Sequence, residues 1–266
     1  MHENPGEAKS GEPILQTRDL TIRFGGHVAV DAVSCAFSPG TLTAIVGPNG
    51  AGKTTYFNLI SGQLRATSGQ VFLRGEDITG LRPPARTDRG LGRAFQLTNL
   101  FPDLSVAENV RLAVASRERI GFRLFSRADG NRAIHEKTMF WLDRVSLADR
   151  ATDKASELPH GDQRKLEVAL LMALEPSVFM FDEPTAGMSV DDVPVILDLI
   201  NGIKANGDRT ILLVEHKMDV VRSLADRIVV LHNGQRVADG LPEAVMSSPV
   251  VLEAYLGKRS GGPAHG

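Results

Sequence analysis

Residues 47–54 read Gly47-Pro48-Asn49-Gly50-Ala51-Gly52-Lys53-Thr54 and match the pattern G-x-x-x-x-G-K-[ST] in full. An apolar run over 41–46 precedes them and predicts a strand, and the residues that follow predict a helix over 53–61 with Gly62 as its left-handed cap. In that setting the glycines let backbone N–H groups turn inward around an anion, and the helix N-terminus adds partial positive charge. A glycine loop that is only a tight turn is the alternative, but it would place Lys53 where the helix dipole disfavours a cation.

The same stretch contains the side chains that a nucleoside triphosphate requires. Lys53 can reach the outer phosphates, and Thr54 offers a hydroxyl to Mg²⁺. The sequence therefore predicts that this loop binds a nucleoside triphosphate together with Mg²⁺.

A second apolar run ends in two carboxylates and reads Ser177-Val178-Phe179-Met180-Phe181-Asp182-Glu183. Alone, such a run indicates a strand followed by a turn or a helix start. Beside Lys53 and Thr54 it predicts that Asp182 binds Mg²⁺ and that Glu183 polarises the attacking water.

Composition limits the classes of protein that remain. The 266 residues are 42% hydrophobic, 23% charged and 5% aromatic, which is typical of a folded chain and excludes disorder for most of it. The formal net charge of −2 gives no basic field for nucleic acid. Cys35 is the one cysteine, so no intrachain disulfide forms, and we expect it to be a small buried residue. Neither a leader-like start nor a long apolar run is evident, so we expect a cytoplasmic protein whose membrane contact, if it has one, goes through a partner.

The distribution of strand and helix signals predicts an α/β fold. Short β-rich runs occupy 14–24, 28–37, 70–74 and 91–95, helical spacing dominates 105–174, and strands return at 178–181, 210–214 and 227–231. Asn233-Gly234 indicates a hairpin. We expect a sheet core flanked by helices, an N-terminal antiparallel β subdomain and an inserted helical subdomain.

Three helices have predicted apolar faces. The faces are formed by Val106, Val110, Ala113 and Val114; by Ile134, Met139, Phe140, Leu142 and Val145; and by Val193, Ile196, Leu197, Ile200 and Ile203. We expect Trp141 to pack between helices rather than to hold a ligand. The five arginines within 117–132 indicate either a solvated loop or a surface for anionic headgroups or a partner.

One further segment connects these motifs to a known family. Leu158-Pro159-His160-Gly161-Asp162, followed by a helix, resembles the Leu-Ser-Gly-Gly-Gln signature of ATP-binding-cassette (ABC) ATPases. Only Leu158 and Gly161 match. In the family this segment contacts the γ-phosphate bound by the opposite subunit, whereas Pro159 has neither a hydroxyl nor an N–H. The helix dipole and the Gly161 N–H remain, so the resemblance implies a weakened site in trans.

The resemblance extends over about residues 20–257 and assigns further positions. Phe24 matches the aromatic residue that stacks on adenine; the alternative is a strand residue that faces the core. Gln96 matches the glutamine that senses Mg²⁺ and the water, and His216 matches the switch histidine at the γ-phosphate, although a lone histidine after a strand is usually structural. Residues 186–190 resemble the loop that crosses to the other nucleotide site, and we interpret Asp191 and Asp192 as charges at a helix start.

Together these assignments define the predicted site. The catalytic residues are Glu183, His216 and Gln96, and the Mg²⁺ ligands are Thr54, Gln96 and Asp182. The nucleotide-binding residues are Phe24, Gly47, Pro48, Asn49, Gly50, Ala51, Gly52, Lys53, Thr54 and Thr55.

Short strings narrow the resemblance to a subgroup. Arg23-Phe24-Gly25-Gly26, Ala186-Gly187-Met188 and the end PEAVMSSPVVLEAYLG over 242–257 resemble the ATPase subunits of branched-chain amino acid importers and their urea or amide relatives. This subgroup implies an Mg-dependent ATPase that pairs with a second ABC ATPase subunit, as a homodimer or heterodimer, and drives a membrane permease. A solute-binding protein would be involved only indirectly. We expect the permease to dock near 96–103, where Leu100-Phe101-Pro102 is apolar.

Two alternatives stay open, a soluble ABC-type ATPase and a nucleotide-dependent regulator that is not coupled to transport. The predicted organisation is a flexible N-terminus over 1–12, a P-loop ATPase core with its β subdomain over 13–96 and 176–257, a helical signature subdomain over 97–175, and a flexible tail over 258–266.

Overall fold

The chain consists of two compact units in a computed structural model that describes residues 12–94, 100–118 and 128–256. The first unit comprises Met1–Leu81 and Leu212–Gly266, and the second comprises Arg82–Ile211. Strand β8 (Thr210–Val214) lies where the chain passes from the second unit back to the first. These limits differ from the predicted domain boundaries, so the division into ATPase core and helical subdomain stays a prediction.

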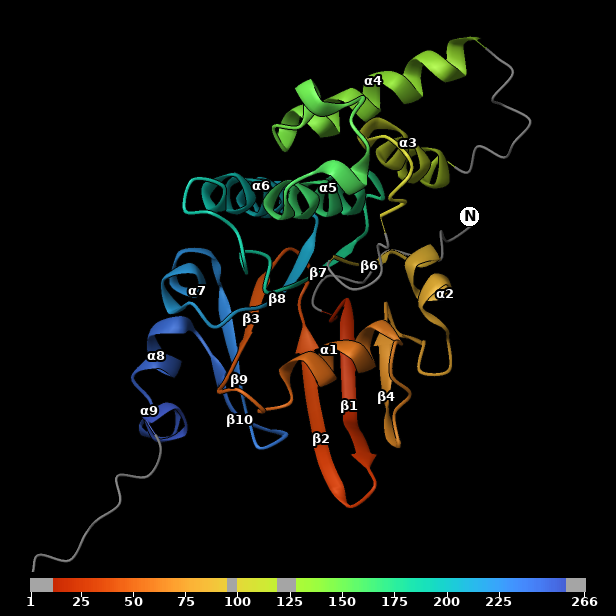
Figure 1. The fold of residues 1–266 in the computed structure, drawn as a ribbon. Helices are drawn as coiled ribbons and strands as arrows, with labels where there is room; N and C mark the ends of the chain where they lie inside the picture. The colour runs from red at the N-terminus through yellow and green to blue at the C-terminus, as the bar shows by residue number, and fades with distance from the viewer. Residues whose placement is uncertain (1–11, 95–99, 119–127, 257–266) are drawn as a thin grey trace, which may run out of the picture. The chain divides into compact units, whose positions relative to one another are not determined.

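The first unit contains the antiparallel sheet that the sequence predicts. Its order is β2-β1-β4-β5, with β1 (Leu15–Phe24), β2 (His27–Phe37), β4 (Ser68–Leu73) and β5 (Glu76–Asp77) (Figure 1). A hairpin joins β1 to β2, since Phe24 pairs with His27 and Gly25 takes a φ of 58° in the turn between them.

A mixed set of strands lies in the same unit. β3 (Leu42–Val46) runs parallel to β9 (Arg227–His232), and β10 (Gln235–Gly240) is antiparallel to β9. Asn233 and Gly234 have φ of 48° and 77°, the left-handed pair that a two-residue hairpin needs. All five residues of β3 are buried, which accounts for its continuous apolar run.

Helices pack on these strands. α1 (Lys53–Ser61) begins and ends as predicted, with Gly62 at φ 81°. Its Tyr56 hydroxyl lies 2.7 Å from the Thr17 hydroxyl of β1, a buried hydrogen bond that fixes the helix to the antiparallel sheet. Helices α7 (Met218–Leu224), α8 (Pro242–Met246) and α9 (Pro249–Leu256) follow in the C-terminal part.

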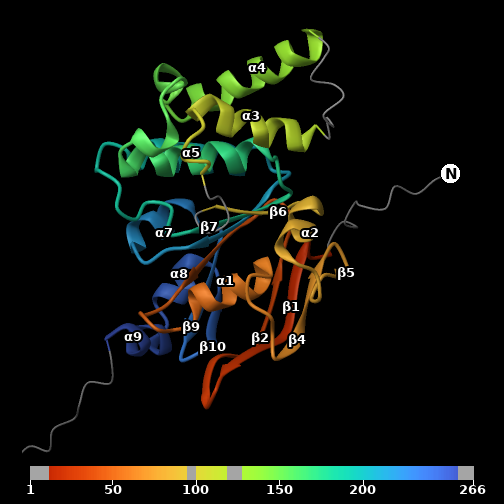
Figure 2. The same cartoon turned by 45° about the vertical axis from the view of Figure 1, so that its right-hand side comes forward.

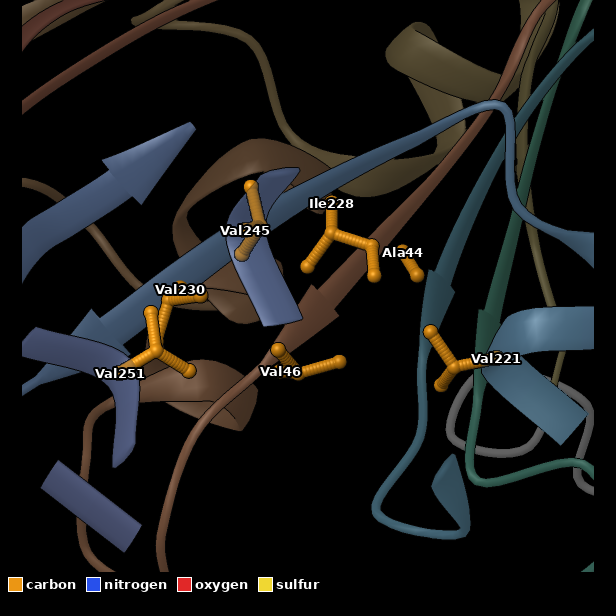
Figure 3. Close-up of a cluster of buried hydrophobic side chains, with 7 residues drawn as sticks. All are labelled: Ala44, Val46, Val221, Ile228, Val230, Val245 and Val251. Atoms are coloured by element: carbon orange, nitrogen blue, oxygen red, sulfur yellow. The ribbon is translucent and has the colours of Figure 1, made fainter. Parts of the chain in front are cut away.

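The packing of those three helices forms a cluster of buried side chains (Figure 3). Val221, Val245 and Val251 come from α7, α8 and α9, and they meet residues of β3 and β9, namely Ala44, Val46, Ile228 and Val230. Branched side chains of this kind pack closely on a parallel strand pair, so the cluster holds β3, and with it the loop that follows, in place. Cys35 is buried in this unit, as expected.

In the second unit, helices pack on one another beside a short strand pair. β6 (Leu91–Arg93) is parallel to β7 (Val178–Asp182), after α2 (Pro83–Asp88). The helices are α3 (Val106–Arg117), α4 (Ala128–Arg144), α5 (His160–Ala173) and α6 (Val193–Ala205), with 3-10 turns at Ala148–Arg150 and Ala155–Glu157. α3, α4 and α5 contact one another in pairs (Figure 2).

Two of the predicted helix faces need correction. In α4 Phe140 is 53% exposed, because the buried stripe runs through Ile134, Thr138, Leu142 and Val145, and Phe140 lies two residues, about 200° of helix, from Leu142. In α6 the face is formed by Ile196, Leu199, Ile200 and Ile203, so Leu199 takes the place expected for Leu197. The face predicted for α3 is buried at all four positions.

Candidate functional site

The loop between β3 and α1 has the backbone of an anion cradle. Gly47, Gly50 and Gly52 take φ of 150°, 78° and 95°. A Cβ at Gly47 would lie 2.1 Å from the Leu231 carbonyl oxygen, and one at Gly52 would lie 2.4 Å from that of Ala29. The loop is thus pressed between β9 and β2, and only glycine fits at these two positions.

Lys53 turns back over this loop. Its Nζ donates hydrogen bonds to the carbonyl oxygens of Gly47 at 2.7 Å and Pro48 at 3.0 Å, and the residue is 7% exposed. Because Lys53 is also the first residue of α1, the ammonium and the helix N-terminus lie at the same loop. Thr54, the next residue of the helix, is exposed. A buried cation beside inward-turning backbone is an arrangement that favours a phosphate group.

Phe24 ends β1 in the same unit and is 50% exposed. The alternative that it faces the core is therefore wrong. It lies across the hairpin from β2, the strand whose Ala29 carbonyl oxygen touches the loop at Gly52. An exposed ring on that hairpin is available for stacking.

Asp182, at the end of β7, has a cationic partner. The Arg93 Nη2 atom lies 2.8 Å from its Oδ2, and the two side chains are 0% and 7% exposed. Burial lowers the pKa of Arg93, and the Asp182 carboxylate opposes that shift. Sequence reasoning missed Arg93; its one signal was a cation inside an apolar β-rich run.

Glu183 follows Asp182 in a strained backbone conformation. Its φ is 50°, in the left-handed region that residues with a Cβ rarely adopt, and its carbonyl oxygen accepts from the Ala186 N–H at 3.1 Å. Strain of this kind is held by the surrounding structure and concentrates at functional sites.

His216 begins the segment after β8 and has a half-exposed side chain. Beneath it the buried Glu215 accepts hydrogen bonds at Oε2 from the backbone N–H groups of His216 at 2.9 Å and Lys217 at 3.2 Å. Glu215 thereby fixes the backbone that carries the imidazole, a role that the sequence analysis did not assign.

The signature segment starts α5. Pro159 occupies the N-cap with no side-chain hydrogen bond, and its carbonyl oxygen accepts from the Gln163 N–H at 2.9 Å. Leu158 is buried, while Pro159 and His160 are exposed. The first turn of the helix therefore presents its N–H groups without a hydroxyl beside them.

An ion-pair network connects this turn to the start of α6. Asp162 accepts from Arg150 at 3.2 Å and from Lys165 at 3.1 Å, and Lys165 also pairs with Asp192. Burial lowers the pKa of Lys165, but the hydrogen bonds to Asp192 and Asp162 outweigh it and raise that pKa overall. Asp192 is the N-cap of α6, but its side chain does not cap the helix; it binds Lys165 and the Ser189 hydroxyl, the latter at 2.7 Å.

Gln96 lies outside the described residues, as does most of the arginine-rich segment. The described part of the expected docking segment is held by Asn109 of α3. Its Oδ1 accepts from the Phe101 N–H at 2.9 Å, and its Nδ2 donates to the Phe101 carbonyl oxygen at 3.1 Å. The Phe101 ring itself is 55% exposed.

Two features are absent from the described residues. In that part of the chain no helix is long and apolar enough to span a membrane. Nor does a group of three or more His, Cys, Asp or Glu side chains that could hold a metal ion occur there.

Comparisons with known proteins agree with these features. Residues 30–186 match the family described as ABC transporter. The high-affinity branched-chain amino acid transport ATP-binding protein LivG of Escherichia coli (strain K12) is 37% identical over 255 residues, 93% of this chain and 99% of LivG. The protein of the same description, BraF, from Pseudomonas aeruginosa is 37% identical over 251 residues, 92% of this chain and 98% of BraF.

Solved structures give the same result. A nucleotide-free ATP-binding cassette from an ABC transporter has a TM-score of 0.77 and 30% identity, covering 92% of this chain and 99% of its own. The ADP conformation of an ATP-binding cassette of an ABC transporter has a TM-score of 0.76 and 30% identity, with coverage of 92% and 99%.

Proposed function

Because this chain belongs to the ABC transporter family, we propose that it binds and hydrolyses ATP to drive a membrane permease. One observation carries the proposal most directly. The Lys53 ammonium lies on the carbonyl oxygens of Gly47 and Pro48, beside three glycines at positive φ. The fold of such a loop does not require a buried cation, whereas a bound polyphosphate requires one to neutralise its negative charge.

The residues present also fit Mg²⁺. The predicted ligands are the Thr54 hydroxyl, the Asp182 carboxylate and the Gln96 amide, and oxygen atoms of these types are the ones that Mg²⁺ prefers. When bound, Mg²⁺ neutralises charge on the phosphate oxygens. The neighbouring Arg93 reduces the negative charge at Asp182, so this carboxylate contributes less attraction to a cation than a free one would.

The chain's own side chains account for the remaining steps. Phe24 stacks on the adenine, and the loop over 47–52 together with Lys53 and Thr55 holds the phosphates. Glu183, at its left-handed backbone position after Asp182, orients and polarises the attacking water. His216, on the backbone that Glu215 fixes, donates to the γ-phosphate.

A second ATPase subunit completes each site in this proposal. The signature segment, Leu158 to Asp162, acts on a nucleotide held by the other ATPase subunit. Without the hydroxyl that the family motif has, α5 supplies backbone N–H groups and its dipole alone. A heterodimer with an ATPase that has a regular signature follows naturally from that loss.

The permease contact and the solute are the finer parts of the proposal. We place the contact at Phe101, because its exposed ring stands on a backbone that Asn109 holds at both N–H and carbonyl oxygen. That contact would keep the chain on the inner face of the membrane. LivG and BraF, named for branched-chain amino acid transport, favour uptake of those amino acids or a related amide or urea solute.

The test is Mg-ATP turnover by the purified chain beside its Glu183→Gln variant, with oligomeric state under ATP read by light scattering. We expect the turnover rate of the variant to be lower by about 100-fold or more while ATP binding is retained, because a general base contributes about that factor to the rate. A wild-type chain that binds ATP but turns it over only when a second ABC ATPase subunit is added supports the heterodimer.

Three results would contradict the proposal or a part of it. Failure of the wild type to bind ATP would overturn the proposal as a whole. Turnover that survives Glu183→Gln would remove Glu183 from the mechanism, and ATP binding with no turnover under any pairing would favour the regulator.

A further inference from the structure

A cavity of about 340 Å³ lies in the second unit, and none of the residues predicted to bind nucleotide lines it. Residues of α4, the end of α5, the start of β7 and the C-terminal half of α6 line it, together with Glu175 and Arg209. Its volume is at the small end of the range for ligand pockets, roughly 300–1,000 Å³, which suits a molecule of amino-acid size.

One wall of the cavity is aromatic. Phe140 and Trp141 of α4 meet edge to face with ring centroids 4.9 Å apart, and Phe140 is 53% exposed. Helix packing does not account for this ring, because the buried stripe of α4 lies on another face. With Ile203 of α6, the pair offers an apolar surface to whatever enters.

Arg144, one helical turn after Phe140, supplies a cation to the same cavity. Among the described residues no carboxylate pairs with it. Its Nη2 atom lies 3.3 Å from the position of a Cβ on Gly202, so the guanidinium lies against α6 where that helix lacks a side chain. A glycine inside a helix is less stable than alanine, and here it leaves room for Arg144.

The second guanidinium in the cavity is already fixed. Arg209 donates from Nη1 to the carbonyl oxygens of Glu175 at 3.3 Å and Pro176 at 3.1 Å, and its Nε lies 3.3 Å from Asp208. Arg209 is therefore committed to these acceptors, and the Glu175 carboxylate of the lining lies 3.8 Å from the Arg117 Nε atom, whereas Arg144 keeps donors that a ligand can use.

We propose that this cavity binds a small apolar carboxylate, with the carboxylate on Arg144 and the apolar body against Phe140, Trp141 and Ile203. A guanidinium binds a carboxylate through two parallel hydrogen bonds, and the aromatic wall beside it excludes water from an aliphatic group. Aliphatic amino acids and their 2-oxo acids share this chemistry. The proposal concerns a second site and does not depend on the transport role proposed above.

Trp141 is the one tryptophan of the chain, so its fluorescence reports this cavity directly. The experiment titrates the full chain with L-leucine, with 4-methyl-2-oxopentanoate and with L-leucinamide, which lacks the carboxylate. We expect a saturable change in Trp141 fluorescence with one or both carboxylates. The one that binds more tightly shows whether the cavity prefers an amino acid or a 2-oxo acid. L-leucinamide should bind at least about tenfold more weakly, since a charged hydrogen bond contributes about that factor.

Two variants test the geometry. Arg144→Gln should weaken binding about tenfold or more, whereas Arg132→Gln should not, because Arg132 is an exposed arginine of the same helix that pairs with Glu136. Gly202→Leu fills the space beside Arg144 and should abolish the signal while ATP binding shows that the chain is folded. No saturable change with either carboxylate, equal binding of L-leucinamide, or binding that survives Arg144→Gln would overturn the proposal.

Discussion

Arg93 and Asp182 form an ion pair of 2.8 Å between the ends of two parallel strands, with both side chains almost entirely out of solvent. Removal of one partner from such a pair leaves an uncompensated buried charge. The predicted metal-binding carboxylate is thus part of the folded core of its own unit.

Arg93→Met should therefore lower the free energy of unfolding by about 3 kcal/mol, since breaking a buried pair costs roughly 3–5 kcal/mol. Urea unfolding measures the change. The double variant Arg93→Met/Asp182→Asn should recover part of the loss, because it removes both charges of the pair together. Strictly additive losses would show that the two side chains do not interact.

Gly52→Ala should destabilise the chain more than Gly50→Ala. Both glycines have positive φ, so each substitution costs about 1–2 kcal/mol of backbone strain. A Cβ at Gly52 also meets the Ala29 carbonyl oxygen at 2.4 Å, whereas one at Gly50 has no atom within 4 Å. Thermal unfolding of the two variants compares them, and equal melting temperatures would contradict the close approach of the loop to β2.

Phe24→Ala should weaken ATP binding about tenfold and leave stability nearly unchanged. Stacking of a base on an aromatic ring contributes about 1–3 kcal/mol, and the ring is half exposed. Titration calorimetry with ATP measures the affinity. Phe101→Ala is the matched control, because this ring is 55% exposed but lies in the other unit; a loss of affinity there would show that the effect is not specific to Phe24.

Phe101→Glu should abolish transport while ATP binding by the isolated chain is retained, since a carboxylate cannot enter an apolar contact without a large desolvation cost. Solute uptake in vesicles that contain the permease measures it. Val250→Glu, at a valine that is 53% exposed in the other unit, is the control and should transport normally. Normal uptake by Phe101→Glu would place the permease elsewhere.

Asp239→Asn should reveal a pH-dependent contribution to stability. Burial raises the pKa of Asp239, but its hydrogen bonds with Arg227, two of 2.6 Å, and with Arg236 outweigh burial and lower that pKa overall. A lowered folded-state pKa stabilises the chain above the unfolded value of about 3.9 and loses that effect as pH falls through the folded value. The variant should be about 1–2 kcal/mol less stable near pH 7, with the difference vanishing in acid.

Urea unfolding at several pH values from neutral to strongly acidic tests this expectation. Asp149→Asn, an exposed residue of a 3-10 turn, should differ little from the wild type throughout. A difference for Asp239→Asn that persists in strong acid would attribute its effect to packing instead.

Local signals in the sequence were enough for the nucleotide loop and the elements around it. The bounds of α1, the cap at Gly62 and the Asn233-Gly234 hairpin depend on residues close together in the chain, and all three are as predicted. Contacts between distant residues could not be predicted in this way. Arg93 and Asp182 are 89 positions apart in the sequence, and no residue pattern near either of them predicts the pairing.

Helix faces show the same limit on a smaller scale. Apolar spacing identified α4 but placed Phe140 on its buried side, because several apolar residues in a row are compatible with more than one stripe. Thr138 belongs to the true stripe because its hydroxyl bonds to the Ile134 carbonyl oxygen at 2.7 Å, which a scale of hydrophobicity does not register.

Asn109 gives the segment around Phe101 a mechanical property. Its amide holds the Phe101 backbone at both polar atoms and also donates to the carbonyl oxygens of Leu104 and Ser105, at 3.4 Å and 2.9 Å. A segment held by so many hydrogen bonds is rigid. A force on the exposed ring therefore moves α3 instead of bending the loop. A displacement of the ring would then be passed on to α3. Asn109→Ala would remove these hydrogen bonds and make the connection between the ring and the helix more flexible.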